Sequence, residues 1–388
     1  MRIVDIRATP VTVLAEAPWR WSNGIELGTT RTVIELITDE AIVGLGETHG
    51  GAGTVRALSI AKEYVLGLDP LELGLIQEKL SPLSRGYAGQ VPAYVRAAIE
   101  IACLDAAGKA LNRSVASLLG GVLRHRVEVA AYLFYRDRSA DASKGGESSP
   151  SEMLDHAEEL VAKHGFRVLK LKGGVLAPYV ELETLRLLRA RFPDAPLVWD
   201  PNAAWSVEST IRIGQQLLSE CLDLQYLEDP CADLEGMSRA RRALSIPFAT
   251  NMCVIRPEQL APGIRMGSVD VVLADIHFWG GFRESQKLAA VCEAFRLGLG
   301  LHSDRELGIS TAAMVHFAAA TPQLSYAMDS HYHDQSGDII AKPWVYHDGY
   351  FELPDGDGLG VEVDADKLAF FHREYLRIGD VDVPHDVR

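Results

Sequence analysis

Hydrophobic and polar residues alternate along two stretches near the start of the chain, residues 2–14 and residues 31–48. A period of two is typical of strands with one buried face, and the TDEA sequence at residues 38–41 has the composition of a turn within the second stretch. We therefore predict an antiparallel sheet. Between the two stretches lies a segment rich in Trp and Gly, residues 18–29, for which we expect either a mobile lid or a packed surface loop.

From residue 54 to about residue 119 the pattern changes, because apolar residues now recur every third or fourth position. The clearest case is the alanine-rich stretch 91–112, which Asn112 closes in the manner of a helix C-terminus. With strands first and helices after them, this part of the chain is predicted to be α+β.

From residue 127 onwards, a short apolar run and a helical stretch alternate with a period of about 25–30 residues. Eight strand–helix units are what a (β/α)8 barrel requires, and in that fold function lies at the C-terminal ends of the strands. We predict an α/β protein with a modified (β/α)8 barrel at residues 126–330 and an α+β capping domain at residues 1–125. The tail at residues 331–388 should fold back onto the cap, because neither piece is large enough to form a good core alone. The eight runs are residues 127–135, 168–172, 197–200, 224–228, 247–250, 270–275, 298–301 and 324–329.

Composition narrows the class of protein. The chain is 47% hydrophobic and 23% charged, as in soluble globular proteins, and its formal net charge of −15 argues against nucleic acid or an anionic membrane as partner. The N-terminal sequence lacks the features of a signal peptide, and no apolar run is long enough to span a bilayer. We expect a cytoplasmic protein with a small-molecule partner, assembled as a homo-oligomer as barrel enzymes often are.

Polar residues close the predicted barrel strands. Asp200, Glu228 and Asn251 end three successive strands, so their side chains should converge on one point of the ring. Three oxygen ligands, two of them anionic, suit Mg²⁺, whereas zinc would favour Cys or His. The alternative is that Asp and Asn only cap the helices that follow.

Two lysines share one predicted strand. Lys170 and Lys172 are two positions apart and therefore lie on one face, which inside a barrel points into the site. Neighbouring ammonium groups lower each other's pKa, so we expect one lysine to be neutral and able to act as a base. The alternative is an exposed edge strand with surface lysines.

An acid and a histidine end two later strands. A carboxylate from Asp275 on one imidazole nitrogen of His302 would fix its tautomer and raise the basicity of the other nitrogen. A structural histidine is the alternative. A lysine and a histidine on opposite sides of a metal-bound carboxylate could remove the α-proton from either configuration, and protonated His302 could then protonate a departing β-hydroxyl.

At these positions the chain resembles the enolase superfamily, in its mandelate racemase and muconate lactonizing enzyme group, and most closely the glucarate dehydratases. The motifs that carry the resemblance are KLKGGVLA, DPNAAW, EDPC, ATNM and ADIHFW. The resemblance implies Mg²⁺ held by Asp200, Glu228 and Asn251, with Lys172 as one base, Lys170 as its electrostatic partner and the Asp275–His302 dyad as the other base. It also implies substrate contacts from Asn202, Tyr132 and His331.

The chain departs from the family pattern at the far end of the substrate. It has IELGT where relatives carry a His in the first lid loop, residues 303–306 where they carry an Asn-rich segment, and an acidic stretch at residues 379–386 where they carry a distal Arg. The second carboxylate of glucarate therefore needs another partner, for which Arg305 and Arg20 are the candidates.

The predicted activity is a Mg²⁺-dependent sugar acid dehydratase, a lyase that yields a 2-keto-3-deoxy acid, and the resemblance implies glucarate as its leading substrate. Three alternatives stay open: dehydration of an aldonic acid with one carboxylate, racemisation or epimerisation of a hydroxy acid on the same scaffold, and a catalytically silent binding protein.

Overall fold

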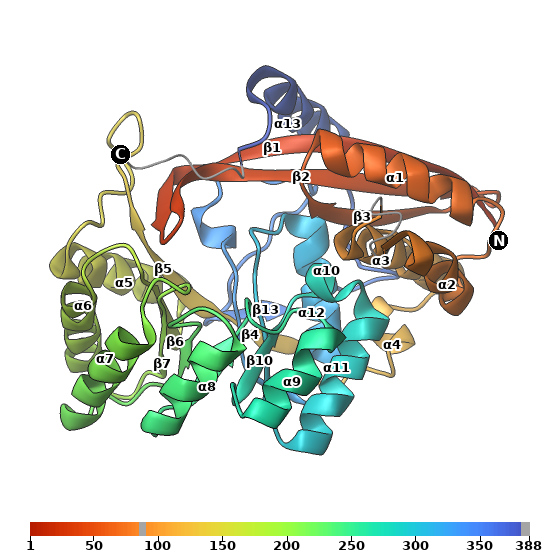
Figure 1. The fold of residues 1–388 in the computed structure, drawn as a ribbon. Helices are drawn as coiled ribbons and strands as arrows, with labels where there is room; N and C mark the ends of the chain where they lie inside the picture. The colour runs from red at the N-terminus through yellow and green to blue at the C-terminus, as the bar shows by residue number, and fades with distance from the viewer. Residues whose placement is uncertain (85–90, 382–388) are drawn as a thin grey trace.

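The computed structural model describes residues 1–84 and 91–381 and has two parts, a three-stranded sheet with helices and a barrel below it (Figure 1). In the sheet β2 lies between β1 and β3 and pairs with both in antiparallel register, as the alternating pattern predicts. Asn112 adopts the left-handed conformation that ends α3, also as predicted. The elements of this part are β1 (Ile3–Trp21), β2 (Gly24–Thr38), β3 (Val43–His49), α1 (Ala52–Val65), α2 (Leu73–Ser84), α3 (Ala93–Leu111) and α4 (Val115–Leu118).

The segment at residues 18–29 is not a loop. It forms the tip of a long β1–β2 hairpin, in which Trp19 pairs with Glu26 and Arg20 pairs with Ile25. The tip also joins the barrel, because Trp19 and Arg20 pair in antiparallel fashion with the end of β5 (Ala130–Arg136). A register shift between Leu14 and Trp19 breaks the simple alternation, which is why the sequence pattern does not reveal the strand here.

The predicted barrel is present, with eight strands, each parallel to its neighbour, in the order of the chain. A parallel bridge between Val129 and Met328 closes the ring. After β5 the strands are β6 (Val168–Lys172), β7 (Leu197–Asp200), β8 (Tyr226–Glu228), β9 (Phe248–Thr250), β10 (Val271–Ala274), β11 (Gly298–Leu301) and β12 (Leu324–Met328).

Helices connect the strands and surround the barrel (Figure 1). The eighth strand differs from the expected repeat, since the short 3-10 helix η1 (Tyr332–Asp334) follows it instead of an α-helix. The connecting helices are α5 (Pro150–His164), α6 (Pro178–Arg191), α7 (Val207–Ser219), α8 (Leu234–Ala243), α9 (Pro257–Met266), α10 (Ile276–Trp279), α11 (Phe282–Phe295) and α12 (Gly308–Ala320).

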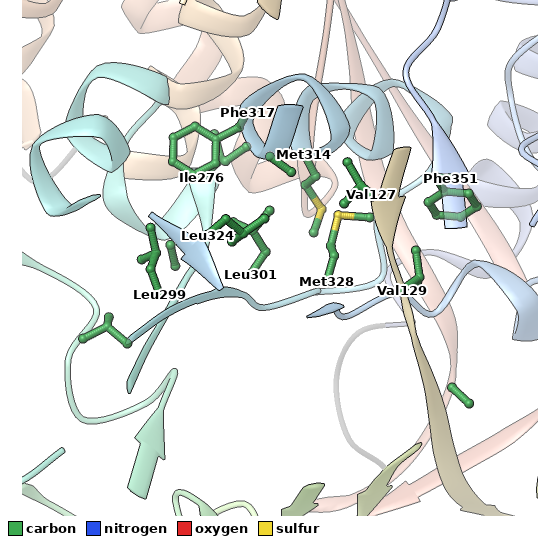
Figure 2. Close-up of a cluster of buried hydrophobic side chains, with 14 of the residues drawn as sticks. Val127, Val129, Ile276, Leu299, Leu301, Met314, Phe317, Leu324, Met328 and Phe351 are labelled. Atoms are coloured by element: carbon green, nitrogen blue, oxygen red, sulfur yellow. The ribbon is translucent and has the colours of Figure 1, made fainter. Parts of the chain in front are cut away.

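The C-terminal tail contacts both the barrel and the three-stranded sheet. Its strand β13 (Tyr350–Glu352) pairs with β4 (Arg126–Glu128), and Figure 2 shows Phe351 beside the buried cluster that includes Val127 and Met328. Its helix α13 (Ala365–Ile378) packs on β1, as Figure 1 shows. Within the described ranges, no helix combines the length and apolar character that crossing a membrane requires.

Candidate active site

The structure brings the predicted polar residues together at the C-terminal ends of the barrel strands. They are buried, and they come from six neighbouring strands and the residues that directly follow them. Lys170 and Lys172 lie in β6, Asp200 ends β7, Glu228 ends β8, and Asn251, Asp275 and His302 follow β9, β10 and β11.

Neither Asp200 nor Asn251 caps the helix that follows it. Ser206 caps α7, and Arg256 occupies the N-cap position of α9. The side chain of Asp200 instead accepts a hydrogen bond from Lys172 Nζ at 2.6 Å, and Glu228 Oε2 lies 2.6 Å from Lys170 Nζ. The capping explanation therefore does not account for these residues.

The donor set fits a hard divalent cation. Burial, together with the charge of Asp200, raises the pKa of Glu228 well above its ordinary value, so a cation between the two carboxylates would relieve their repulsion. Among the described residues, Glu228 Oε2 is buried and has the Lys170 ammonium 2.6 Å away, but no donor meets it with hydrogen-bond geometry. Residues 1–84 and 91–381 contain no group of three His, Cys, Asp or Glu side chains that could hold a metal ion by themselves. Asn251, beside Glu228, carries an amide oxygen that could serve as a further ligand.

Asn251 links this carboxylate group to His302. With its amide oriented to match its neighbours, the nitrogen donates to Glu228 Oε1 at 3.2 Å and to Asp229 Oδ2 at 3.0 Å, while the oxygen accepts from His302 Nε2 at 2.8 Å. Asn251 thus lies between the acidic residues and the imidazole, and its amide would have to turn over to present its oxygen to a cation beside Glu228.

Lys170 has a different environment from the one that we expected. Its ammonium group lies 2.6 Å from both Glu228 Oε2 and Asp329 Oδ2, and 4.7 Å from the centre of the Tyr132 ring. Burial alone would lower the pKa of Lys170, but the charges of Asp329 and Glu228 raise it well above its ordinary value. The prediction that mutual repulsion lowers the pKa of both lysines is therefore wrong for Lys170, which is a charged structural partner.

The sequence reasoning missed Asp329. This residue directly follows β12, just as Asp275 follows β10, so the same strand-end pattern could have identified it.

Lys172 contacts Asn202 as well as Asp200. Asn202 Oδ1 accepts from Lys172 Nζ at 2.6 Å, and Asn202 Nδ2 donates to Ser22 Oγ at 3.0 Å. Since Ser22 lies in the turn of the β1–β2 hairpin, Asn202 connects the ammonium group to the hairpin tip.

Asp275 both caps a helix and orients His302. Its Oδ1 accepts from the backbone N–H groups of His277 at 2.8 Å and Phe278 at 3.2 Å, and its Oδ2 lies 3.1 Å from His302 Nδ1. Burial would lower the pKa of His302, but the hydrogen bond and charge of Asp275 raise it. The imidazole is thereby favoured in its protonated form, with Nε2 directed away from Asp275.

A pocket of about 340 Å³ opens above these residues, and both Lys172 and His302 line it. Tyr132 and His331 also line the pocket, with ring centres 4.7 Å apart, and His331 Nδ1 lies 2.9 Å from Ser303 Oγ. Burial and the charge of Arg305 hold the pKa of His331 well below its usual range, so this imidazole is neutral.

The outer wall of the pocket contains Arg305, which was a candidate from the sequence, and three residues that the sequence pattern did not single out. The hairpin contributes Trp21 and Glu26, and the segment after β11 contributes Asp304 and Arg305. Of the two arginines predicted to hold a second carboxylate, Arg305 lines the pocket. The other, Arg20, lies 3.8 Å from Asp137 and does not line it. Most of the acidic stretch 379–386 lies outside the described residues.

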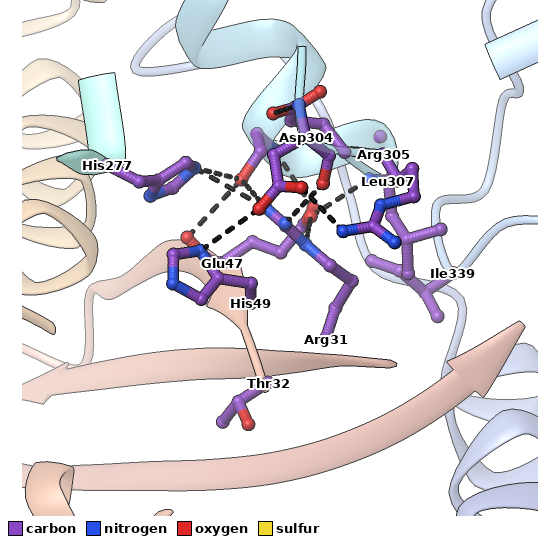
Figure 3. Close-up of polar contacts among 12 residues, drawn as sticks. Arg31, Thr32, Glu47, His49, His277, Asp304, Arg305, Leu307 and Ile339 are labelled. Atoms are coloured by element: carbon purple, nitrogen blue, oxygen red, sulfur yellow. Dashed lines mark hydrogen bonds and ion pairs between the residues drawn. The ribbon is translucent and has the colours of Figure 1, made fainter. Parts of the chain in front are cut away.

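A buried ion pair fixes the segment after β11 (Figure 3). Arg31 Nε donates to Glu47 Oε1 at 2.9 Å, and neither side chain is exposed. Arg31 Nη1 donates to the backbone oxygen of Asp304 at 3.0 Å, while Glu47 accepts from the N–H groups of Leu307 and Ser310, both at 2.9 Å. The capping sheet thus holds the backbone beside His302.

Comparisons with known proteins agree with this architecture. Residues 4–120 match the mandelate racemase / muconate lactonizing enzyme N-terminal domain family, and residues 152–367 match the enolase C-terminal domain-like family. A curated relative from Streptomyces coelicolor, described as "Probable glucarate dehydratase", is 36% identical, and the match covers 97% of this chain and 92% of that protein.

Two solved structures are similar over nearly their whole length. An isomerase from Streptomyces coelicolor A3(2) is 39% identical with a TM-score of 0.84, covering 96% of this chain and 99% of that one. An enolase from Pseudomonas fluorescens Pf0-1 with bound magnesium, potassium and tartrate is 33% identical with a TM-score of 0.90, covering 97% and 93%.

Proposed function

Because the chain belongs to the mandelate racemase / muconate lactonizing enzyme family of the enolase superfamily, we propose that it is a Mg²⁺-dependent dehydratase of sugar acids. The observation that carries this proposal is that Lys172 and His302 line one pocket. They belong to β6 and to the end of β11, and the strands that carry Asp200 and Glu228 lie between these two in the ring. The curated relative described as a glucarate dehydratase supports the same class of reaction.

We assign Asp200, Glu228 and Asn251 as the groups that hold the metal ion. When bound, Mg²⁺ would withdraw electron density from a substrate carboxylate and make its α-proton more acidic. Lys170 offsets the negative charge of Glu228 and Asp329, and so keeps the buried carboxylates compatible with the barrel interior.

The protein side chains carry the protons. Lys172 removes the α-proton from substrates of one configuration, and His302 removes it from those of the other. The β C–O bond then breaks, and protonated His302 donates a proton to the departing hydroxyl, which leaves as water. The remaining enol becomes the 2-keto-3-deoxy acid. Asn202, Tyr132 and His331 contact the hydroxyl groups of the sugar chain in this proposal, and residues 1–125 with 331–388 act as the cap over the catalytic barrel.

A second candidate is racemisation, epimerisation or another isomerisation. Two bases on different sides of one pocket can return a proton to either face of the same carbon, and one similar structure is an isomerase. The two reactions differ in one measurable respect, because only dehydration releases water and an α-keto product.

The test is a screen of the purified protein with Mg²⁺ against sugars carrying one or two carboxylates, performed in D₂O. We expect 2-keto-3-deoxy products from at least one substrate. Deuterium at the α-carbon without loss of water would favour the isomerase, whereas neither product nor exchange with any sugar acid would contradict both and favour a binding protein. The Glu208→Gln variant, which changes an exposed side chain outside the pocket, serves as a control and should react like the wild type.

A further inference from the structure

The charged groups on the outer wall of the pocket are already paired with one another. The Arg305 guanidinium forms an ion pair with Glu26 and donates to Asp304 Oδ1 at 2.7 Å. All three side chains line the pocket and are largely buried. One positive and two negative groups leave this wall with a net charge of −1 when all three are ionised.

Asp304, one of the two acidic residues of this wall, stays ionised. Burial would raise the pKa of Asp304, but the charge of Arg305 holds it well below its ordinary value. His49 Nδ1 lies 3.6 Å from Asp304 Oδ2, on the side away from the guanidinium contact.

The backbone of the same segment is held on two sides. Arg31 donates to the carbonyl oxygen of Asp304, and Gln335 Nε2 donates to the carbonyl oxygen of Arg305 at 3.3 Å. Arg305 itself has a φ of +62°, a conformation that few residues other than glycine adopt. These contacts keep the Arg305 side chain between its two carboxylate partners.

The wall also offers uncharged hydrogen-bonding groups. Trp21 lines the pocket, and its Nε1 is buried without a hydrogen-bond partner among the described residues. When Glu306 is ionised, the Ser303 hydroxyl donates to it at 2.6 Å and accepts from His331 Nδ1, which leaves His331 Nε2 as an acceptor. A hydroxyl group both donates and accepts, so it matches this set of partners, whereas a carboxylate only accepts.

From this arrangement we infer that the site selects sugar acids with a single carboxylate, whose far end is a neutral hydroxyl group held by Glu26, Asp304 and Trp21. The inference rests on the proposed function and narrows its substrate class. A second carboxylate would meet two negative groups, and the guanidinium that could bind it is already shared between them.

The test compares acids that differ only in the group at carbon 6. D-gluconate and D-glucarate form one such pair, and D-galactonate and galactarate form another. We expect kcat/KM for water loss or α-proton exchange to be at least about tenfold higher for the monoacid of the pair whose configuration the enzyme accepts. A diacid used as well as its monoacid, or better, would overturn the inference.

The Glu26→Gln variant makes the test specific to this wall. Removing one negative group frees Arg305 for a second carboxylate, so the preference for the monoacid should fall by at least about tenfold. Asp304→Asn, which removes the other partner, should act in the same direction and replaces Glu26→Gln if that variant does not fold. Asp137→Asn is the matched control, because it breaks the Arg20–Asp137 pair outside the pocket and should leave the preference unchanged. A preference that neither Glu26→Gln nor Asp304→Asn alters would overturn the inference.

Failure of the proposed function has a different signature. If no sugar acid reacts or exchanges its α-proton, the proposed function is wrong. The preference for one carboxylate can then still be tested by measuring how tightly the acids bind. With Mg²⁺ present, the monoacids should raise the unfolding temperature more than the matched diacids, and Glu26→Gln should reverse that order. Equal shifts in the wild type would overturn it.

Discussion

The buried ion pair between Arg31 and Glu47 gives a quantitative prediction about stability. In Glu47→Gln the Arg31 guanidinium, which has no exposed surface, loses the opposite charge 2.9 Å away. Removing one partner of a buried pair costs about 3–5 kcal/mol, because the other charge stays buried and uncompensated.

The hydrogen bonds of Glu47 add to this cost. Its Oε2 accepts from the backbone N–H of Ser310, and its Oε1 accepts from Leu307 and from Arg31. A glutamine has one oxygen, so its amide nitrogen would face a donor and leave it unsatisfied, for a further penalty of about 1–3 kcal/mol. We expect the free energy of unfolding to fall by about 4–8 kcal/mol in total.

Urea unfolding followed by tryptophan fluorescence measures this change. Glu208→Gln is the matched control, since it makes the same substitution at the exposed Arg239–Glu208 pair and should leave the unfolding midpoint unchanged. A double variant, Arg31→Met with Glu47→Gln, should be less destabilised than the two single variants added together, because it no longer buries a lone charge. A loss below about 1 kcal/mol in Glu47→Gln, or strict additivity, would refute the reasoning.

Three other predictions concern catalysis, the metal ion and pH. In His302→Asn we expect dehydration to fall by about 10²–10⁴-fold while Lys172 still exchanges the α-proton of matching substrates, as NMR in D₂O would detect; full dehydration would remove His302 from its role as acid. Mg²⁺ should raise the unfolding temperature of the wild type, EDTA should abolish activity, and Glu228→Gln should lose the thermal shift; a shift of wild-type size in that variant would contradict the assigned ligand. Burial raises the pKa of Glu100 to about 7, so the folded state binds its proton more tightly and stability falls as pH rises from about 4.5 to above 7. Relative to Glu100→Gln, the wild type should lose about 3 kcal/mol over that interval in urea unfolding, and parallel pH profiles would contradict the shift.

Much of the barrel and the inner part of the site could be predicted from the sequence. Each apolar run ends at a polar residue, and strand order alone brings Asp200, Glu228 and Asn251 to neighbouring positions on the ring. This works because a parallel barrel places consecutive runs side by side, so position along the chain becomes position around the site.

The outer wall could not be predicted in this way. Glu26 and Arg305 are 279 positions apart, and their pairing depends on how the hairpin lies across the barrel. The contact between Arg31 and the Asp304 backbone has the same origin. Periodicity reports the environment of one element at a time, so contacts between distant elements leave no local pattern.

The packing of the tail on the first strand has a consequence for how the chain folds during its synthesis. Thr12 Oγ1 donates to the Gly379 backbone oxygen at 2.9 Å, and His372 Nδ1 lies 2.7 Å from the Pro10 oxygen, so β1 receives its native partners from residues made some 360 positions later. At ribosomal rates of about 5–20 residues per second, roughly 20–70 s separate the two segments. During that interval the hairpin lacks the helix that covers it, and chaperone binding to nascent chains should therefore concentrate on β1 and β2 until α13 has emerged.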